Sequence, residues 1–364
     1  MTEAIRVLVV DDSTVVRRAV RDSLSKDPEI VVCATAANGK MALEQISECK
    51  PDVLILDIEM PEMDGFELLR HLARDHPMIR TIMFSSMTER GAAQTIDALS
   101  LGASDYASKP SGIRGEGYST AILQVAAELI PKIKQFRPGP PRGGITVQEL
   151  QSPPRGLGAP SASRAPLLPR IVAIGLSTGG PEALSKLLPA FPRSFPVPIV
   201  IVQHMPPLFT RLLSERLAAC SALRVVEGTE GMVLEAGLAC IVPGNFHATI
   251  RESAGKIVLA LNQEPPENSC RPSADVLFRS VAGVCGSRAL GVIMTGMGRD
   301  GFSGLRAMKG ENAVIFAQDR ETSVVWGMPS LVVREGLADA VLPLGRLSAA
   351  IAKFASNGVV ANDC

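Results

Sequence analysis

Short apolar runs alternate with amphipathic runs from residue 5 to residue 136. The apolar runs are RVLVV, IVVCAT, DVLIL, TIMFS and DYAS, most of them rich in β-branched residues and of a length suited to buried strands. The longer runs between them, such as STVVRRAVRDSL and GFELLRHLA, repeat apolar positions with the 3.6-residue period of a helix. This alternation is typical of βα units around a parallel sheet. It predicts an N-terminal α/β domain of five βα units over residues 1–136.

The same alternation resumes at residue 170, with the strand-like runs IVAIG, PIVIVQH, ALGVIMTG and AVIFA. One interruption, LACIVPGNFHATIRESAGKIVLAL, contains alternating runs on either side of a glycine-containing turn, which is the pattern of a β-hairpin. The pattern therefore predicts a second domain over residues 170–364. We expect it to be doubly wound and mainly parallel α/β, with one antiparallel hairpin.

Residues 137–169 separate the two predicted domains and are rich in proline and glycine. A stretch of this composition buries too little apolar surface to offset the entropy lost on ordering. Its arginines could contact a partner, but the composition favours a solvated tether. We predict a flexible linker.

The charge and cysteine content narrow the class of protein. The 37 basic residues equal the 37 acidic residues in number, so no overall charge attracts the chain to nucleic acid. The seven cysteines include no C-x-x-C pair, the N-terminus does not resemble a signal peptide, and no apolar run approaches the roughly 18 residues of a membrane span. We expect a cytoplasmic protein that does not bind nucleic acid.

Carboxylates follow two of the predicted strands in the first domain. Asp11 and Asp12 come directly after RVLVV, and Asp57 comes directly after DVLIL. Ser85 and Lys109 reach the same edge of the sheet, because the carboxyl ends of parallel strands lie together. Oxygen ligands without His or Cys suit Mg²⁺, and a metal with a lysine would stabilise a phosphoryl group on an aspartate. Helix capping could explain one of the acids, but not the whole set.

Residues 5–130 resemble a response-regulator receiver domain, which has a flavodoxin-like (βα)5 fold. The motifs VVDDS, LDIEMPEMDG and the terminal Lys-Pro pair carry the resemblance. It implies that Asp57 is the phosphoacceptor. It also implies Mg²⁺ ligands and switch residues, namely Asp11, Asp12, Asp57 and the backbone carbonyl of Glu59 for the metal, and Ser85, Tyr106 and Lys109 for the switch.

The turn GLSTGGP, residues 175–181, follows a predicted strand and precedes a helical run. A dinucleotide fingerprint would place Ser177 where a second glycine must admit the pyrophosphate, and the run PIVIVQH ends in Gln203 and His204 rather than in the ribose-binding acid. The same residues match G-x-S-x-G, in which a serine is exposed on a tight turn before a helix. A Ser-Thr pair here could also be a simple helix N-cap. We favour a nucleophilic serine.

A serine nucleophile needs a base and a carboxylate that orients the base. His204 ends the next strand run, whereas His247 lies inside the predicted hairpin, where a structural role is more probable. Asp300, in GVIMTGMGRDG, follows another strand run, although it could instead cap the helix that begins after it. The order Ser, His, Asp differs from that of the α/β-hydrolases, so a different α/β fold is predicted.

Residues 170–355 resemble the catalytic domain of the chemotaxis protein-glutamate methylesterases, the CheB family. The matching stretches are GLSTGG, VQHM, VPGNFH, CRPSADVLF, MTGMGRDG and AQDRETSVVWGMP, with Trp326 at a position where Tyr is expected. The resemblance implies Ser177 as nucleophile, His204 as base and Asp300 as its orienting partner. It also suggests residues near the oxyanion or the substrate, namely Met297 through its backbone N–H, Thr178, Cys270, Arg271 and Ser273.

The resemblance implies hydrolysis of glutamate methyl esters on methyl-accepting chemotaxis receptors, and deamidation of glutamines. It implies a chemotaxis histidine kinase as phosphodonor, activation through Asp57, Mg²⁺ in the receiver and no cofactor for the esterase step. Contact with membranes would occur only through the receptors. A DNA-binding regulator is disfavoured because the second domain is long, strand-rich and without a basic helix-turn-helix pattern. A non-catalytic docking regulator, or the same chemistry in a non-chemotaxis signalling array, remains an alternative.

Overall fold

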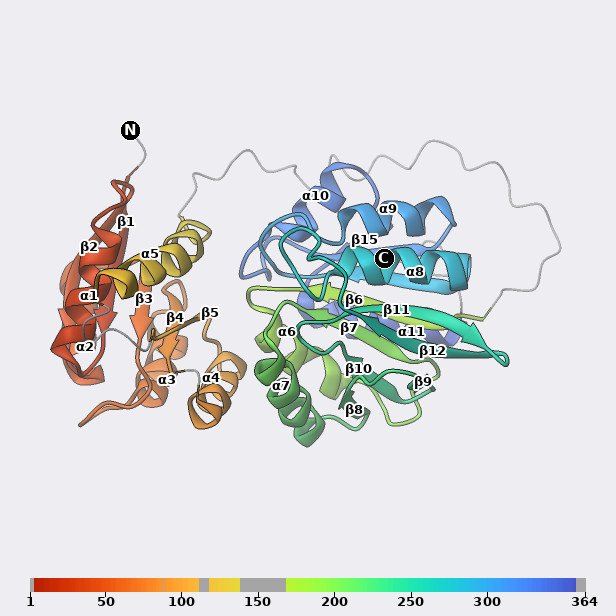
Figure 1. Ribbon diagram of the computed structural model, residues 1–364, viewed down its shortest axis with the longest axis horizontal. Helices are drawn as coiled ribbons and strands as arrows, with labels where there is room; N and C mark the ends of the chain where they lie inside the picture. Colours follow the sequence, from red (N-terminus) through yellow and green to blue (C-terminus); the bar gives the residue numbers. More distant parts are fainter. Residues whose placement is uncertain (1–2, 87, 111–117, 138–167, 358–364) are drawn as a thin grey trace.

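The computed structural model describes residues 3–86, 88–110, 118–137 and 168–357. Two α/β domains lie side by side (Figure 1). The predicted linker, 137–169, falls almost entirely outside the described residues.

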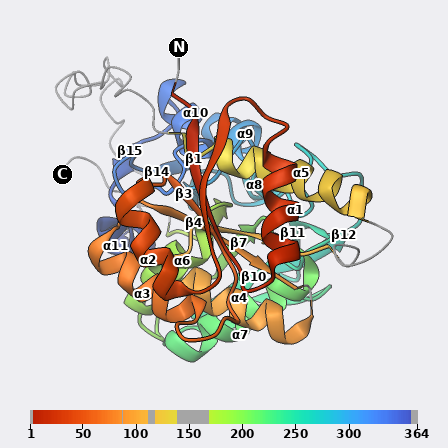
Figure 2. The same cartoon turned by 90° about the vertical axis from the view of Figure 1, so that its left-hand side faces the viewer.

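The first domain is a five-stranded parallel sheet in the order β2-β1-β3-β4-β5, as the five predicted βα units require. Its strands are β1 (Ile5–Val10), β2 (Ile30–Ala36), β3 (Val53–Leu56), β4 (Arg80–Ser85) and β5 (Asp105–Ser108). Its helices are α1 (Thr14–Leu24), α2 (Gly39–Cys49), α3 (Gly65–Asp75), α4 (Glu89–Ser100) and α5 (Tyr118–Lys134). Figure 2 shows α1 and α5 on one face of the sheet and α2 and α3 on the other.

Helix capping does not explain the positions of Asp11 and Asp12. The N-cap of α1 is Ser13, and its side chain makes no capping hydrogen bond. Asp11 Oδ1 accepts a hydrogen bond from the backbone N–H of Ser13, before the helix begins. The other carboxylate oxygen of Asp11 stays directed at the sheet edge, toward Lys109.

The second domain contains a seven-stranded parallel sheet in the order β15-β14-β13-β6-β7-β10-β8. Its strands are β6 (Ile171–Leu176), β7 (Ile199–Gln203), β8 (Arg224–Glu227), β10 (Leu238–Ile241), β13 (Ala289–Ile293), β14 (Val314–Gln318) and β15 (Ala340–Leu342). Its helices are α6 (Gly180–Leu187), α7 (Pro207–Cys220), α8 (Ala274–Cys285), α9 (Phe302–Gly310), α10 (Met328–Arg334) and α11 (Leu344–Asn357), with 3₁₀ turns η1 (Leu188–Ala190) and η2 (Gly286–Arg288). Chain order reverses at β6, so the sheet has a topological switch point there.

Helices cover both faces of this sheet. Successive strand residues point to opposite faces, so both sets of side chains are buried. In β6, Val172 and Ile174 join a cluster with α6, α7 and α11, whereas Ile171 and Ala173 join a cluster with α8, α9 and α10. Six fully buried strand positions in a row therefore explain why the sequence run is apolar throughout rather than alternating.

The predicted hairpin is present as β11 (His247–Ser253) and β12 (Lys256–Asn262), which pair antiparallel around a two-residue turn. Ala254 and Gly255 in the turn have φ of 49° and 75°, a conformation that suits hairpin turns. A short third strand, β9 (Val233–Leu234), extends this small sheet. The preceding apolar run LACI forms β10 of the parallel sheet instead. The short strands β8, β9 and β15 were not predicted, because each offers only two to four residues of pattern.

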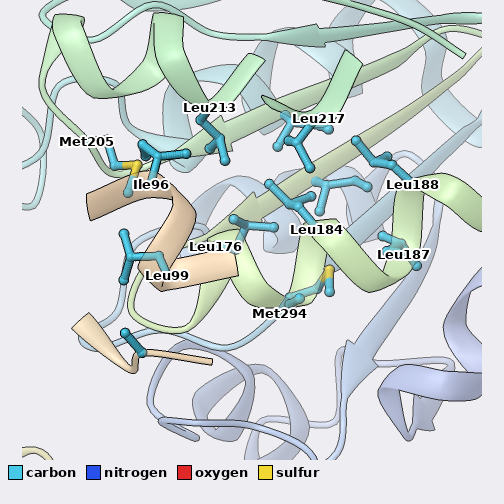
Figure 3. Close-up of a cluster of buried hydrophobic side chains, with 14 of the residues drawn as sticks. Ile96, Leu99, Leu176, Leu184, Leu187, Leu188, Met205, Leu213, Leu217 and Met294 are labelled. Atoms are coloured by element: carbon cyan, nitrogen blue, oxygen red, sulfur yellow. The ribbon is translucent and has the colours of Figure 1, made fainter. Parts of the chain in front are cut away.

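The two domains share one apolar cluster. Ile96 and Leu99 of α4 lie among Leu184 of α6 and Leu213 and Leu217 of α7, as Figure 3 shows. Charged side chains flank this contact, with Arg211 and Arg216 of α7 paired to α4. The face of the first domain that carries α4 is therefore packed against the second domain.

None of the helices in the described parts of the chain is long and apolar enough to cross a bilayer.

Candidate active site and phosphoacceptor site

The predicted acidic cluster forms at the carboxyl edge of the receiver sheet. Carboxylate oxygens of Asp11, Asp12 and Asp57 all lie within 4.8 Å of one another. Lys109 Nζ lies 2.7 Å from Asp57 Oδ2 and 2.8 Å from Asp11 Oδ2. An all-oxygen donor set with three negative charges fits Mg²⁺. The side chain of Glu59 contacts Gln94 and Arg90 of α4, and a metal role for its carbonyl stays a prediction.

The electrostatics of Asp57 match a crowded anionic site. Burial raises the pKa of Asp57, and the nearby Asp11 raises it further, while the ion pair and hydrogen bond with Lys109 oppose this. A cation bound among the three carboxylates would relieve the repulsion.

The predicted switch residues connect this site to the second domain. Ser85 Oγ donates to the Gly91 carbonyl at the start of α4, at 3.3 Å. Tyr106 stacks on Phe209 of α7, with ring centroids 4.5 Å apart and planes 16° apart. Lys109 N–H donates to the Ser85 carbonyl, so these two predicted switch residues are directly linked.

Ser177 lies on a tight turn between β6 and α6. The turn requires glycine twice: Gly179 has φ of 79°, and a Cβ at Gly180 would lie 1.9 Å from Gln203 Oε1. The N-cap of α6 is Gly179, so neither Ser177 nor Thr178 caps the helix. Gln203 Nε2 donates to the Ser177 carbonyl at 3.0 Å, which ties the turn to the end of β7. The N-cap alternative is therefore wrong, and a half-exposed serine remains at the strand end.

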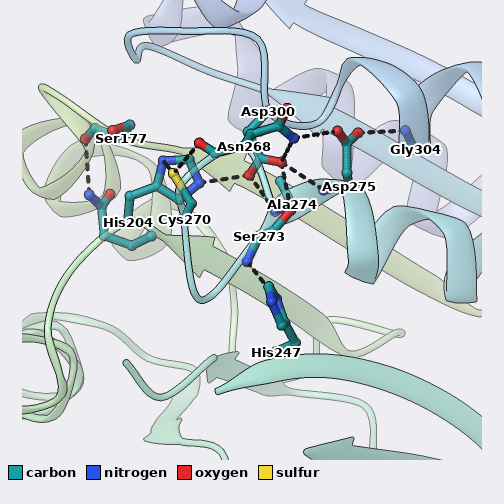
Figure 4. Close-up of polar contacts among 11 residues, drawn as sticks. Ser177, His204, His247, Asn268, Cys270, Ser273, Ala274, Asp275, Asp300 and Gly304 are labelled. Carbon is teal, nitrogen blue, oxygen red and sulfur yellow. Dashed lines mark hydrogen bonds and ion pairs between the residues drawn. The ribbon is translucent and has the colours of Figure 1, made fainter. Parts of the chain in front are cut away.

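Ser177, His204 and Asp300 follow the neighbouring strands β6, β7 and β13 of the sheet (Figure 4). His204 Nε2 lies 2.8 Å from Asp300 Oδ2, and both side chains are largely buried. The backbone N–H of His204 also donates to the Leu176 carbonyl, next to the serine. The switch point of the sheet therefore gathers the three predicted residues.

Asp300 does not cap α9, whose N-cap is Gly301. It binds the start of α8: Ser273 Oγ donates to Oδ1 at 2.6 Å, and the Ala274 N–H donates to Oδ2 at 2.6 Å. Burial raises the pKa of Asp300, but the hydrogen bonds from His204, Ser273 and the Ala274 amide outweigh it and lower the pKa to about 2. The carboxylate is therefore ionised and held rigidly against the imidazole.

Known proteins resemble this chain over both domains. The response regulator receiver domain family matches residues 7–115, and the CheB methylesterase family matches residues 172–351. A protein-glutamate methylesterase/protein-glutamine glutaminase of Nocardioides sp. is 47% identical over 349 residues, 93% of this chain and 92% of the relative. This chain is a member of the CheB family. The same-named protein of Trichodesmium erythraeum is 44% identical, over 94% of this chain and 97% of that protein.

The crystal structure of the Thermotoga maritima CheB methylesterase catalytic domain resembles the second domain. Its sequence identity to this chain is 40%, with a TM-score of 0.51 over 52% of this chain and the whole of that domain. The predicted fold class, a receiver followed by a mainly parallel α/β methylesterase domain, is confirmed.

His204, the predicted base, has an elevated pKa. Burial lowers the pKa of His204, but hydrogen bonds with Asp300 and Cys270 outweigh it and raise the pKa to about 9. Cys270 Sγ lies 3.6 Å from Nδ1, and in the described part of the chain no hydrogen bond joins Ser177 Oγ to the imidazole. His247, predicted to be structural, is buried, with Nδ1 accepting from the Ser273 N–H.

The residues suggested near substrate lie in different environments. Met297 is 48% exposed, and a Cβ at the adjacent Gly296 would lie 2.8 Å from Ser177 Cβ, so this turn rests against the serine. The Arg271 guanidinium instead braces a loop, donating to Asn245 and to the carbonyls of residues 263 and 264. Trp326 donates through Nε1 to the Gln318 carbonyl, 3.1 Å away.

Thr178 lies at the domain interface. Its Oγ1, one residue after Ser177, donates to Asp105 Oδ2 of the receiver at 2.9 Å. Sequence reasoning missed Asp105, as well as Asn268, whose Nδ2 donates to Asp300 Oδ1 at 2.9 Å. Asp105 adjoins the switch residue Tyr106, which was the available signal, whereas nothing local marks Asn268.

Proposed function

We propose that this CheB-family chain hydrolyses glutamate methyl esters, and deamidates glutamines, on methyl-accepting chemotaxis receptors. The relatives at 44% and 47% identity carry the name protein-glutamate methylesterase/protein-glutamine glutaminase. The observation that carries the proposal is the placement of Ser177 beside a 2.8 Å His204–Asp300 pair at three neighbouring strand ends. We infer that the protein acts in the cytoplasm, where it meets membranes only through the receptors.

Acyl transfer at this site follows serine-esterase chemistry. Ser177 Oγ attacks the ester carbonyl while His204 Nδ1 takes the hydroxyl proton, and Asp300 stabilises the imidazolium through Nε2–H. The tetrahedral intermediate collapses, and the imidazolium returns the proton to the methoxide, which leaves as methanol. Water, deprotonated by the same base, then hydrolyses the acyl-enzyme to glutamate. We assign oxyanion stabilisation to the backbone N–H of Met297 and the N-terminus of α6. A glutamine side chain reacts likewise and releases ammonia.

We assign regulation to the receiver, with Asp57 as phosphoacceptor and a chemotaxis histidine kinase as donor. Asp11, Asp12, Asp57 and the Glu59 carbonyl would hold Mg²⁺, which neutralises charge during phosphoryl transfer when it is bound. Lys109 contacts Asp57 and would hold the transferred phosphoryl group.

The receiver contacts the nucleophile turn directly. The Gly179 N–H donates to the Ser104 carbonyl at 3.1 Å, and Thr178 donates to Asp105. Both receiver residues immediately precede Tyr106. A rearrangement of Tyr106 after phosphorylation would therefore change the contacts of the two residues that follow Ser177, and we propose that this couples the receiver to the esterase.

Methanol release from methylated receptor membranes tests this assignment. A small phosphodonor should accelerate release by the wild type about 5-fold to 150-fold, the usual range of coupling between two sites. Asp57→Asn should stay at the unstimulated rate, since it lacks the carboxylate that accepts phosphate. Asp75→Asn, an exposed acid on α3, serves as the matched control and should respond like the wild type. An Asp57→Asn protein that is still stimulated would contradict the assignment of the phosphoacceptor.

Charge reversal tests the docked interface. Asp97 of α4 pairs with Arg216 of α7 at 2.9 Å, both side chains being about half exposed. Asp97→Lys replaces this attraction with repulsion, so we expect unstimulated methanol release to rise about twofold to fivefold, in line with the small energy of an exposed pair. Adding Arg216→Glu should restore the wild-type rate. Asp75→Lys is the control, because Asp75 pairs within the receiver. A double variant no closer to the wild type than the single one would argue against this docked arrangement.

A further inference from the structure

The His204 imidazole has a partner at each ring nitrogen. Nε2 lies 2.8 Å from Asp300, and Nδ1 lies 3.6 Å from Cys270 Sγ, as Figure 4 shows. Because Nε2 carries the proton that faces the carboxylate, Nδ1 is the nitrogen that must accept the proton of Ser177. In this docked state, the nitrogen needed for catalysis faces the sulfur of Cys270.

A rigid turn places Cys270. Glu267 and Cys270 exchange two backbone hydrogen bonds of 3.1 and 2.9 Å, and the residues between them, Asn268 and Ser269, have φ of 51° and 63°. Two positive φ values in a two-residue loop are typical of a type I′ turn, in which Asn is favoured. The Asn268 side chain donates to Asp300 at 2.9 Å. The carboxylate that orients the imidazole therefore also anchors the turn that carries the thiol.

We propose that Cys270 is a positioning residue for the esterase base, whose thiol occupies His204 Nδ1 in the unphosphorylated enzyme until Ser177 Oγ takes its place. This inference rests on the proposed function, since it requires His204 to be the base. In the imidazolium form, Nδ1–H donates to Cys270 Sγ. When that proton passes to solvent, Nδ1 is free to accept a hydrogen bond from Ser177 Oγ. Sulfur is a weak hydrogen-bond acceptor, so the serine hydroxyl can displace it.

The contact with Cys270 also affects the protonation of His204. The Cys270 thiol is among the groups that raise the pKa of His204. A protonated imidazole cannot accept the serine proton, so at neutral pH the thiol lowers the fraction of His204 available as base. Removing the thiol should lower the pKa of His204, while the hydrogen bond to Asp300 keeps it above its ordinary value.

The experiment measures kcat/KM for methanol release between pH 6 and pH 10 with full-length, unphosphorylated protein. In the wild type, kcat/KM should rise with pH as His204 loses its proton. Cys270→Ala should move this rise to lower pH and increase kcat/KM at pH 7 about threefold to tenfold, the equivalent of one modest hydrogen bond. Cys270→Ser keeps a hydrogen-bond acceptor and should fall between the two. Cys220→Ala, which removes an exposed thiol at the end of α7, should match the wild type.

Two results would overturn the role of Cys270. One is a Cys270→Ala profile that coincides with that of Cys220→Ala, and the other is a loss of rate without any movement of the profile. Thermal melting checks that each variant is folded, and Cys270→Ser supplies the comparison if Cys270→Ala is not. Ser177→Ala, measured alongside, separates the two proposals: an active Ser177→Ala refutes the serine esterase itself, whereas an inactive one with an unmoved Cys270→Ala profile refutes only the positioning role.

Discussion

Methanol release should fall by on the order of 10⁴-fold or more when Ser177 is replaced with alanine, because the variant has no hydroxyl to form the acyl-enzyme. The backbone should hardly change, since the Ser177 carbonyl and N–H, not its side chain, make the contacts with Gln203, Gly180 and Thr295. The residual rate would come from the oxyanion site and from substrate binding.

The control is Ser185→Ala, which removes a hydroxyl that donates to the Pro181 carbonyl. Ser185 lies in α6, the helix that follows the turn of Ser177. This variant should keep the wild-type rate. Phosphorylation should not rescue Ser177→Ala, because the defect is chemical rather than regulatory. Retention of more than a hundredth of the wild-type rate by Ser177→Ala, with normal melting, would show that another group is the nucleophile.

Asp300→Asn is expected to lower kcat by about 10⁴-fold. An amide at this position would turn its NH₂ group toward His204 Nε2, which would then have to be the acceptor nitrogen. The proton would move to Nδ1, the nitrogen that must accept from Ser177, and the imidazolium would lose its counter-charge. The variant should therefore bind methylated receptor membranes but release almost no methanol.

Asp300→Asn should also unfold at a lower temperature, because the hydrogen bonds from Ser273 and the Ala274 amide lose their charged acceptor. The matched control is Asp275→Asn, a second buried acid nearby, which accepts from the Gly304 N–H at 2.6 Å and does not contact the imidazole. It should lower the melting temperature while keeping most of kcat. Equal losses of kcat in the two variants would mean that Asp300 acts only through stability.

In both domains, the candidate site residues that follow the strands could be predicted from the sequence. An apolar run fixes where a strand ends, and in a parallel sheet the residues just after those ends meet at one edge. Asp11, Asp12 and Asp57 were therefore identifiable as a group, and so were Ser177, His204 and Asp300, although the members of this second group are up to 123 residues apart in the chain. The short strands β8, β9 and β15 were not predicted, because two to four residues are too few to show an alternation of apolar and polar positions.

The sequence by itself determined the two α/β domains and the residues at their strand ends, since hydrophobic periodicity and turn chemistry are local properties. Only the tertiary structure decided which partners those residues have. The contact of Thr178 with Asp105, the anchoring of Asp300 by Asn268 and Ser273, and the thiol at His204 Nδ1 all join segments brought together by packing. A hydrogen bond depends on distances of a fraction of an ångström, which no local sequence pattern encodes.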